Sequence, residues 1–500
     1  MKKNKPLVIG MFLCLGLLTI ISANAGAVSG LKELHSAGFG RLSGIYNAKG
    51  VAIDSQGNIL VTGYASYYST MSYITVKYTN SFVQIDSVTY NSPSEDMPTG
   101  IAVDSHDNII VTGNTYNGSN YDWYTIKYSS RMQVLTSATE DRGNNDLSGR
   151  IAVDKDDNII IAGWTNNGTD NDFLIVKYNN DLVVQSSATY DNGNNEIPQG
   201  VAVDAEGNIF VNGTRYGVGP ADNFTIKYNP ALEVVTSALY FGEHYDVAGG
   251  VAVDSQGNVI AVGKTDIPKN DGLEFDYGYK ILKYDNDLQL LESEVFTSGI
   301  TNPDAVHGVA VDREDNVIVV GYKENTKTSV DNDYVTFKYN EFLILQSSAV
   351  YDGGSEDHAE AVAVDRNNNI VVTGMKNISE TPYEDDFFTI MYDGSSGGAI
   401  VFETGDVKVR GGENGFIDPG KGEEAKISFK ATEAGTVTMK IFTLKGQLVW
   451  ENEKEMTGEG EDYIKWACKN SGGEIVSSGV YIVHVTGAGI NMKKKIAIVR

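Results

Sequence analysis

Short segments in which apolar and polar residues alternate recur along most of the chain, separated by glycine, asparagine and aspartate. One phrase of this kind recurs seven times, and its clearest form is VAVDAEGNIFVNG at 201–213. It begins at Val51, Ile101, Ile151, Val201, Val251, Val309 and Val362. Alternation with a period of two predicts β-strands, and the residues between the phrases predict tight turns.

Two further phrases complete each repeat of about fifty residues, as in DFLIVKY ending at Tyr178 and LVVQSSATY at 182–190. Each repeat therefore predicts four short strands, and a four-stranded unit repeated radially is the blade of a β-propeller. We predict an all-β chain with a seven-bladed β-propeller over 26–404. His35 to Phe39 resembles the fourth-strand phrase but precedes the first repeat. We expect this segment to complete the last blade and close the ring, with 399–404 as the alternative.

The first 25 residues have the order of a secretory signal peptide. Three lysines lie within the first five residues, an apolar run covers 7–21, and Ala23-Asn24-Ala25 forms a small-x-small cleavage site. We expect cleavage after Ala25 and a secreted or cell-surface protein. The apolar run is too short for a transmembrane helix, and no later segment reaches spanning length.

Charge and cysteine content narrow the classes of partner. The chain has a formal net charge of −27, spread along its length. A surface of this kind repels phosphate backbones, which argues against nucleic acid and anionic lipid as partners. Of the two cysteines, Cys14 leaves with the signal, so Cys468 has no internal disulfide partner.

The repeats resemble the bacterial SBBP family of β-propeller repeats, which occurs in large secreted or surface proteins. The phrases that begin at Val201 and Val251, with the strand phrases that follow them, carry this resemblance. It implies the propeller fold but no common chemistry, so the function has to be argued from sites.

Residues 405–500 break the repeat and bring new strand phrases separated by glycine turns, which predicts a small Ig-like β-sandwich. KIFTLKGQLV from Lys440, SSGVYIVHV from Ser477 and the final KKIAIVR resemble C-terminal modules related to the FlgD-like hook-cap domain and the type IX secretion sorting domain. In type IX systems this resemblance implies export and surface attachment through the secretion machinery. One departure is Trp466-Ala467-Cys468, where such modules usually have Trp-Asp-Gly.

Two residue types recur with the blades in a way that favours a scaffold role. The Asp154–Asn158 element lacks the glycine and the distal acid of a calcium loop, because Ile159 follows it. We interpret this element and its six copies as hairpin turns that bond local backbone. The lysine of the KY phrase recurs in six blades, and Met391 replaces it in the seventh. We expect these lysines to pair with a repeated aspartate or to lie along the blade face.

A ring of acids lies five residues before the inner-strand phrases. Its members are Asp96, Asp146, Glu196, Asp246, Asp304 and Asp357. The long loops gather on this face, so we predict that the acids bind a cation such as Ca²⁺, or a cationic ligand, at the channel mouth. The structural alternative is that each acid accepts backbone hydrogen bonds at the link between two blades. No obligate cofactor is expected.

The same face carries aromatic residues and histidines. Tyr116, Trp164 and Tyr216 combine apolar area with a polar group, which suits the recognition of sugars or proteins, although they could also pack against strand ends. His244, His307 and His358 precede the inner-strand phrases of blades 5, 6 and 7. If they converge, they form a metal or acid–base cluster with the neighbouring acids; otherwise they are solvated loop residues.

These features favour a secreted or cell-surface binding protein without enzymatic activity. The sequence contains no nucleophile elbow, zinc signature, phosphate loop or dinucleotide fingerprint. We expect the long-loop face to recognise an extracellular glycan or protein and the C-terminal domain to serve export or attachment. One alternative is a propeller enzyme acting on extracellular polysaccharide, and another is a purely structural element of the envelope.

Overall fold

The computed structural model describes most of the chain, and the description below is limited to those residues. They are 29–40, 44–67, 70–217, 219–240, 245–268, 275–297, 305–324, 332–341, 343, 345–354, 356–378, 384–395, 407–410, 417, 419, 424–443, 447–458 and 460–498.

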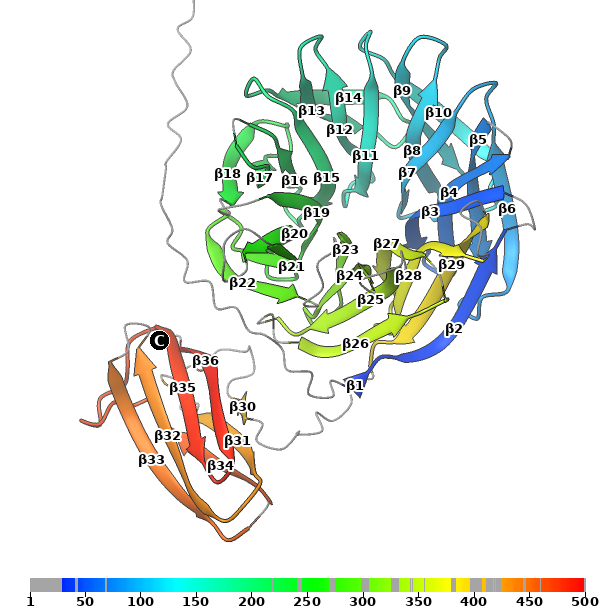
Figure 1. The fold of residues 1–500 in the computed structure, drawn as a ribbon. Helices are drawn as coiled ribbons and strands as arrows, with labels where there is room; N and C mark the ends of the chain where they lie inside the picture. The colour runs from blue at the N-terminus through cyan, green and yellow to red at the C-terminus, as the bar shows by residue number, and fades with distance from the viewer. Residues whose placement is uncertain are drawn as a thin grey trace, which may run out of the picture.

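Seven four-stranded antiparallel units, counted over the described residues, are arranged around a common centre (Figure 1). Blade 1 contains β3 (Gly44–Ile53), β4 (Ile59–Tyr67), β5 (Thr70–Tyr78) and β6 (Gln84–Tyr90); blade 2 contains β7 (Asp96–Val103), β8 (Ile109–Tyr116), β9 (Tyr121–Tyr128) and β10 (Val134–Glu140). Blade 3 contains β11 (Asp146–Val153), β12 (Ile159–Asn166), β13 (Asn171–Tyr178) and β14 (Val184–Tyr190); blade 4 contains β15 (Glu196–Val203), β16 (Ile209–Arg215), β17 (Asp222–Tyr228) and β18 (Val234–Tyr240). Blade 5 contains β19 (Asp246–Val253), β20 (Val259–Pro268), β21 (Phe275–Tyr284) and β22 (Leu290–Thr297); blade 6 contains β23 (Ala305–Val311), β24 (Val317–Glu324), β25 (Asn332–Tyr339) and β26 (Leu345–Tyr351). Blade 7 contains β27 (Asp357–Val364), β28 (Ile370–Asn377) and β29 (Glu384–Asp393).

The N-terminal segment closes the ring. β2 (Lys32–Phe39) pairs antiparallel with β29 and becomes the fourth strand of blade 7 (Figure 1). The preceding β1 (Ser29–Gly30) pairs parallel with β26 of blade 6. The sequence-based prediction of an N-terminal latch is therefore confirmed, whereas the alternative donor at 399–404 lies outside the described residues.

The apolar core of the propeller lies between neighbouring blades. For example, Phe173 and Ile175 of β13 pack with Val211 and Phe224 of blade 4 in one cluster of buried residues. A strand presents successive side chains to opposite faces of its sheet, so each blade supplies apolar residues to both of its neighbours. This arrangement explains why the strand phrases contain runs of β-branched and aromatic residues.

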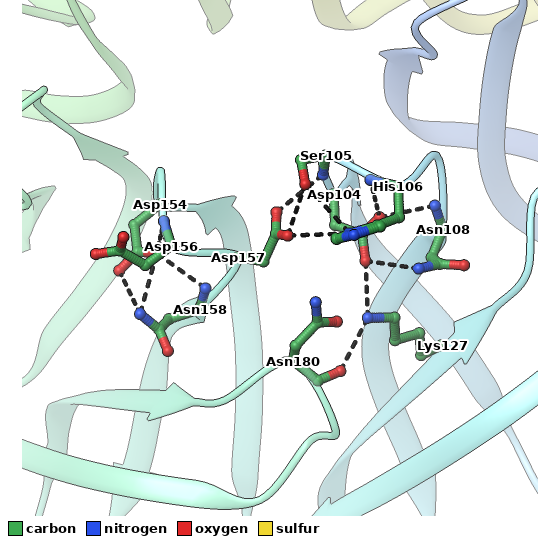
Figure 2. A network of polar contacts seen from close by, with 10 residues as sticks. All are labelled: Asp104, Ser105, His106, Asn108, Lys127, Asp154, Asp156, Asp157, Asn158 and Asn180. Carbon is green, nitrogen blue, oxygen red and sulfur yellow. Dashed lines mark hydrogen bonds and ion pairs between the residues drawn. The ribbon is translucent and has the colours of Figure 1, made fainter.

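The repeated lysines join neighbouring blades on the short-loop side. Each donates to a carbonyl of the next blade, and five of them also pair with the aspartate of their own blade. Nζ of Lys127 lies 2.8 Å from Oδ2 of Asp104 and donates to the carbonyl of Asn180, in the next blade, at 2.9 Å (Figure 2). Asp104 also accepts from the backbone and side chain of Asn108, as expected for a turn. The equivalent lysine–aspartate contacts are Lys77–Asp54, Lys177–Asp154, Lys283–Asp254 and Lys338–Asp312. The scaffold interpretation of both residue types is confirmed.

The C-terminal residues form two further sheets with a core of their own. One sheet contains β30 (Val407–Arg410), β31 (Ala425–Ala431) and β34 (Gly460–Trp466), and the other contains β32 (Gly435–Thr443), β33 (Leu448–Met456), β35 (Gly479–Gly487) and β36 (Ile490–Ile498). Phe429, Val437, Trp466 and Val483 are among the residues buried between them. Cys468 is buried in the same core with a φ of 55°, at the turn where the sequence departs from Trp-Asp-Gly.

Candidate functional site in the central channel

Each inner strand contains a β-bulge at the same place, halfway along its length. The extra residue is Lys49, Thr99, Gly149, Gln199, Gly249 with Gly250, His307 and Glu360 in blades 1 to 7. A bulge leaves this residue without a partner on the adjacent strand and re-aims its side chain. The backbone bulge is therefore the same in all seven blades, but the residue at the bulge differs. As a result, the backbone of the ring is symmetric while the side chains at the bulges are not.

The bulges line a cavity in the channel to which all seven inner strands contribute. Its volume is about 170 Å³. The inner strands approach closely around it: a Cβ atom added at Gly200 would lie only 2.6 Å from the backbone nitrogen of Val251. Pockets for drug-sized ligands usually have roughly 300–1,000 Å³. The channel therefore has room for a single charged group of a ligand, while a larger ligand would extend onto the face of the propeller.

Glu360 of blade 7 is the centre of an ionic cluster in this channel. Its Oε1 lies 2.6 Å from Nζ of Lys49, and its Oε2 lies 3.2 Å from Nδ1 of His307. Burial alone would raise the pKa of Glu360, but His307 and Lys49 lower it well below its usual range. Glu360 is therefore a carboxylate at neutral pH, held by two neighbouring blades.

His307 has a defined orientation. Its Nδ1 lies 3.2 Å from the carbonyl of Ala359 and 3.2 Å from Oε2 of Glu360, and both of these atoms are acceptors. The proton of the neutral imidazole therefore sits on Nδ1, which leaves the Nε2 lone pair to accept a proton or a hydrogen bond.

Arg150 adds a second strong cation to the channel wall. Its Nη1 donates to the carbonyls of Thr99 at 2.6 Å and Lys49 at 3.0 Å, in the first two blades. Burial lowers the pKa of its guanidinium, and Glu360 raises it in part. Nη1 holds the side chain in place in the wall of the channel cavity, and a guanidinium has further N–H groups that suit a carboxylate or sulfate. The cations Lys49 and Arg150 outnumber the single carboxylate of Glu360 in this cluster. The cluster therefore has a net positive charge, although the whole chain is acidic.

Two of the predicted histidines converge through an aromatic ring. Tyr322 stacks on His358 with ring centroids 4.0 Å apart, and its edge packs against His307 at 5.6 Å. Burial lowers the pKa of His358 to about 4, so this imidazole is neutral at physiological pH. His244 lies outside the described residues. The predicted cluster thus forms in part, but its acid is Glu360 rather than a member of the acid ring.

The acid ring is not exposed at the channel mouth, and this part of the expectation is wrong. Asp96, Asp146, Glu196, Asp246 and Asp357 have no exposed surface, and Asp304 lies outside the described residues. The link between blades folds over them: backbone nitrogens of Ser92, Arg142 and Gly353 donate to Asp96, Asp146 and Asp357 respectively. These contacts match the structural alternative, and a ligand-binding role for the ring stays an untested prediction.

The predicted aromatic residues lie in or next to second strands: Tyr116 ends β8, Trp164 lies within β12, and Tyr216 directly follows β16. Tyr116 packs against Tyr121 with ring centroids 5.2 Å apart, and Tyr216 is 37% exposed. Trp164 is half-buried and directly follows the central glycine of its strand, as Tyr322 does in blade 6. The aromatic residues are therefore spread over several blades, and their role in recognition is untested.

Glu360, Lys49 and Arg150 were not identified from the sequence. The bulged residue stands five positions before the aligned aspartate of each repeat, where the chain reads Lys, Thr, Gly, Gln, Gly, His and Glu in turn. Variation at this position was the available signal for Lys49 and Glu360. For Arg150 it was the next position, where the other repeats have Gly or Ala. Its meaning depends on the bulge, which re-aims the side chain into the channel.

Comparison with known proteins supports the fold. Residues 39–66, which include most of β3 and β4, match the family model of the SBBP beta-propeller repeat. A comparison with curated protein sequences finds no match. The chain is similar in structure to the polysaccharide lyase Uly1, with 10% identity, a TM-score of 0.48 and coverage of 72% of this chain and 100% of that one. It is also similar to PorZ of Porphyromonas gingivalis, a surface component of the type-IX secretion system, with 13% identity, a TM-score of 0.34 and coverage of 91% of this chain and 75% of that one. A third similar structure is virginiamycin B lyase from Staphylococcus aureus, with 10% identity, a TM-score of 0.45 and coverage of 71% of this chain and 98% of that one.

The fold and the channel therefore define a β-propeller protein. More particularly, its first blade carries the SBBP repeat, and two small sheets follow the propeller. At these sequence identities and TM-scores, the likeness to the solved structures carries no argument about the function of this chain.

Proposed function

We propose that this chain is an exported, non-enzymatic binding protein whose channel takes up one acidic group of an extracellular polymer. The observation that carries the proposal is the pair of cations in the channel of an otherwise symmetric ring: Lys49 is the bulged residue of blade 1, and Arg150 directly follows the bulged residue of blade 3. A carboxylate or sulfate of an acidic glycan fits a cavity of this size and charge, and arginine suits such groups because of its planar fork of donors. An acidic side chain of a protein partner offers the same chemistry.

The negative charge of the whole chain opposes the approach of an acidic polymer, but its range is short. At physiological ionic strength, charges further apart than about 8 Å are largely screened from one another. The local excess of positive charge in the channel then decides whether an anionic group binds. Affinity in this proposal falls as salt is added, because the attraction is electrostatic.

An array of acidic and neutral extracellular glycans tests this proposal directly. The purified protein is expected to bind uronate- or sulfate-bearing glycans and to leave neutral ones unbound. Arg150→Gln should abolish this selectivity. Equal binding to neutral and acidic glycans, or selectivity that survives in Arg150→Gln, would overturn the proposal.

The remaining parts of the proposal concern the ends of the chain. We infer that the first 25 residues direct export and that 405–500 serve surface attachment or secretion, as their sequence resemblance suggests. No helix among the described residues is long and apolar enough to cross a membrane. Deleting 405–500 should release the propeller from the cell surface into the medium. Retention of the truncated protein on cells would place the attachment elsewhere.

One observation favours a second function, that of an enzyme acting on an acidic polysaccharide. The Nδ1 proton of His307 is held by Glu360 and Ala359, so Nε2 can act as a general base beside Tyr322. Release of new reducing ends from an acidic polysaccharide, abolished by His307→Ala, would support this function. Binding without any release of reducing ends would leave the chain a binding protein.

A further inference from the structure

Two junctions between neighbouring blades gather three carboxylates each. Between blades 2 and 3 these are Asp122 of β9, Asp141 of the link and Asp146 of β11, and one oxygen of each lies within 4.8 Å of the other two. Between blades 3 and 4 the same distance limit holds for Asp170, Asp172 and Asp191. Asp172 and Asp191 follow Asp122 and Asp141 by one repeat of fifty residues, so the two clusters share two equivalent acids, while the third acid, Asp146 or Asp170, comes from a different position of the repeat.

Buried carboxylate oxygens in both clusters lack a hydrogen-bond partner among the described residues. Asp122 is 4% exposed; its Oδ2 accepts from Asn117 at 2.8 Å, while its Oδ1 has no donor. Asp146 is fully buried, and its Oδ1 likewise has no donor. Asp172 is 3% exposed; Asn167 donates to its Oδ2 at 2.9 Å, and its Oδ1 has none. Leaving a charged buried oxygen unsatisfied is costly, so a positive group is expected there.

At two other junctions of the same propeller, the protein itself supplies neutral donors or a cation. Between blades 1 and 2, Asp96 accepts from the side chains of Ser92 and Thr115. Between blades 4 and 5, Nζ of Lys280 lies 3.7 Å from Asp246. The basic residue nearest in sequence to the 2/3 cluster, Arg142, is engaged with Glu140 at 2.9 Å.

Arg215, at the end of β16, is also engaged, in this case with Asp222 at 3.3 Å. The carboxylates within each cluster therefore repel one another, and neither arginine neutralises them.

We propose that the junctions between blades 2 and 3 and between blades 3 and 4 each bind one Ca²⁺ ion. The ligands are all carboxylate oxygens, which is the chemistry that this ion prefers. Oxygens on opposite sides of Ca²⁺ lie about 5 Å apart, since each is about 2.3–2.6 Å from the ion, so three oxygens that all lie within 4.8 Å of one another are close enough to share one ion. The exposed positions of Asp141 and Asp191 leave a side open for water ligands. Asp146 is the one member of the predicted acid ring that takes part.

Calorimetric titration of the chelator-treated full chain with CaCl₂ tests the proposal. We expect two ions to bind per chain, one to be lost in Asp122→Asn, one in Asp172→Asn, and both in the double variant. The exposed Asp181→Asn is the matched control and should keep both ions. Extracellular calcium modules usually have Kd values of about 10⁻⁴–10⁻³ M, so the titration extends to millimolar CaCl₂.

Thermal melting distinguishes a metal site from a purely structural role. In EDTA, Asp122→Asn should melt higher than the wild type, because one of three repelling charges is gone. In millimolar CaCl₂ the order should reverse, since only the wild type gains from binding at that junction. Absence of calcium binding, or an unchanged stoichiometry in the folded double variant, would overturn the proposal. Loss of an ion in only one variant would confine the site to that junction and overturn the other.

Discussion

Nζ of Lys49 lies 2.6 Å from Oε1 of Glu360, and this contact joins the first blade to the seventh, where the ring closes. The same carboxylate contacts His307 of blade 6 through its other oxygen. A single buried acid thus links three inner strands at the channel. Closure of the propeller depends on this ionic contact as well as on the pairing of β2 with β29.

Replacing this acid should weaken the propeller. In Glu360→Gln, Lys49 and His307 lose their common carboxylate, and we expect the free energy of unfolding to fall by about 1–3 kcal/mol. Because the folded pKa of Glu360 is lowered, its stabilising effect is complete above the unfolded pKa of about 4.3 and is lost as the pH falls below it. Urea denaturation at pH 7 and pH 3 measures both effects. If wild type and Glu360→Gln differ in free energy of unfolding by the same amount at pH 7 and at pH 3, this account is wrong.

The lysine–aspartate contacts within the blades should contribute strongly to stability. Lys127→Met leaves Asp104 buried without its cation, and we expect a loss of about 3–5 kcal/mol. Adding Asp104→Asn should recover part of this loss, because the uncompensated charge is removed. Met391 occupies the same position in blade 7, so methionine fits this site. A single variant as stable as the wild type in urea would show that the contact is not important.

The N-terminal latch can be tested at one aromatic residue. Phe39 of β2 packs against Phe387 and Tyr46, with ring centroids 5.9 Å and 6.1 Å apart. Because Phe39 is only partly buried, we expect Phe39→Ala to cost about 2–3 kcal/mol, less than the roughly 3–5 kcal/mol for a fully buried aromatic residue. Val83→Ala, at a site that is 62% exposed, is the control. Equal melting temperatures for the two variants would mean that β2 does not hold the ring closed.

A buried acid at the link before blade 7 predicts a specific pH dependence. Burial raises the pKa of Asp357 to about 7, although Gly353 and Lys376 lower it in part. A raised folded pKa means that the stabilising effect is complete below the unfolded pKa of about 3.9 and is lost as the pH rises to 7. Relative to Asp357→Asn, the wild type should therefore lose up to about 1.4 kcal/mol per pH unit between these values. Parallel stability curves from pH 4 to 8 would contradict the assignment.

The propeller could be predicted from the sequence because its evidence repeats. A strand pattern that occurs seven times identifies the strands more securely than a single copy would. His35 to Phe39 also has the sequence of a fourth strand, and in the structure it pairs with β29. The channel site depends instead on geometry that a repeat does not reveal. Glu360 lines the channel because a bulge turns it there, and Asp96 is hidden because the link at Ser92 folds over it. Both features arise from tertiary contacts rather than from the alternation of residue types.

Calorimetric titration with a uronate oligosaccharide tests the central claim most directly, because the charged channel residues predict opposite changes in affinity. Arg150→Gln should weaken binding by about 10–100-fold, the value of a charge-assisted hydrogen bond. Glu360→Gln should strengthen it, because the competing carboxylate is removed. The exposed Arg131→Gln should bind as the wild type does. If the wild type binds and Arg150→Gln and Glu360→Gln leave its affinity unchanged, the ligand does not enter the channel and the account is wrong.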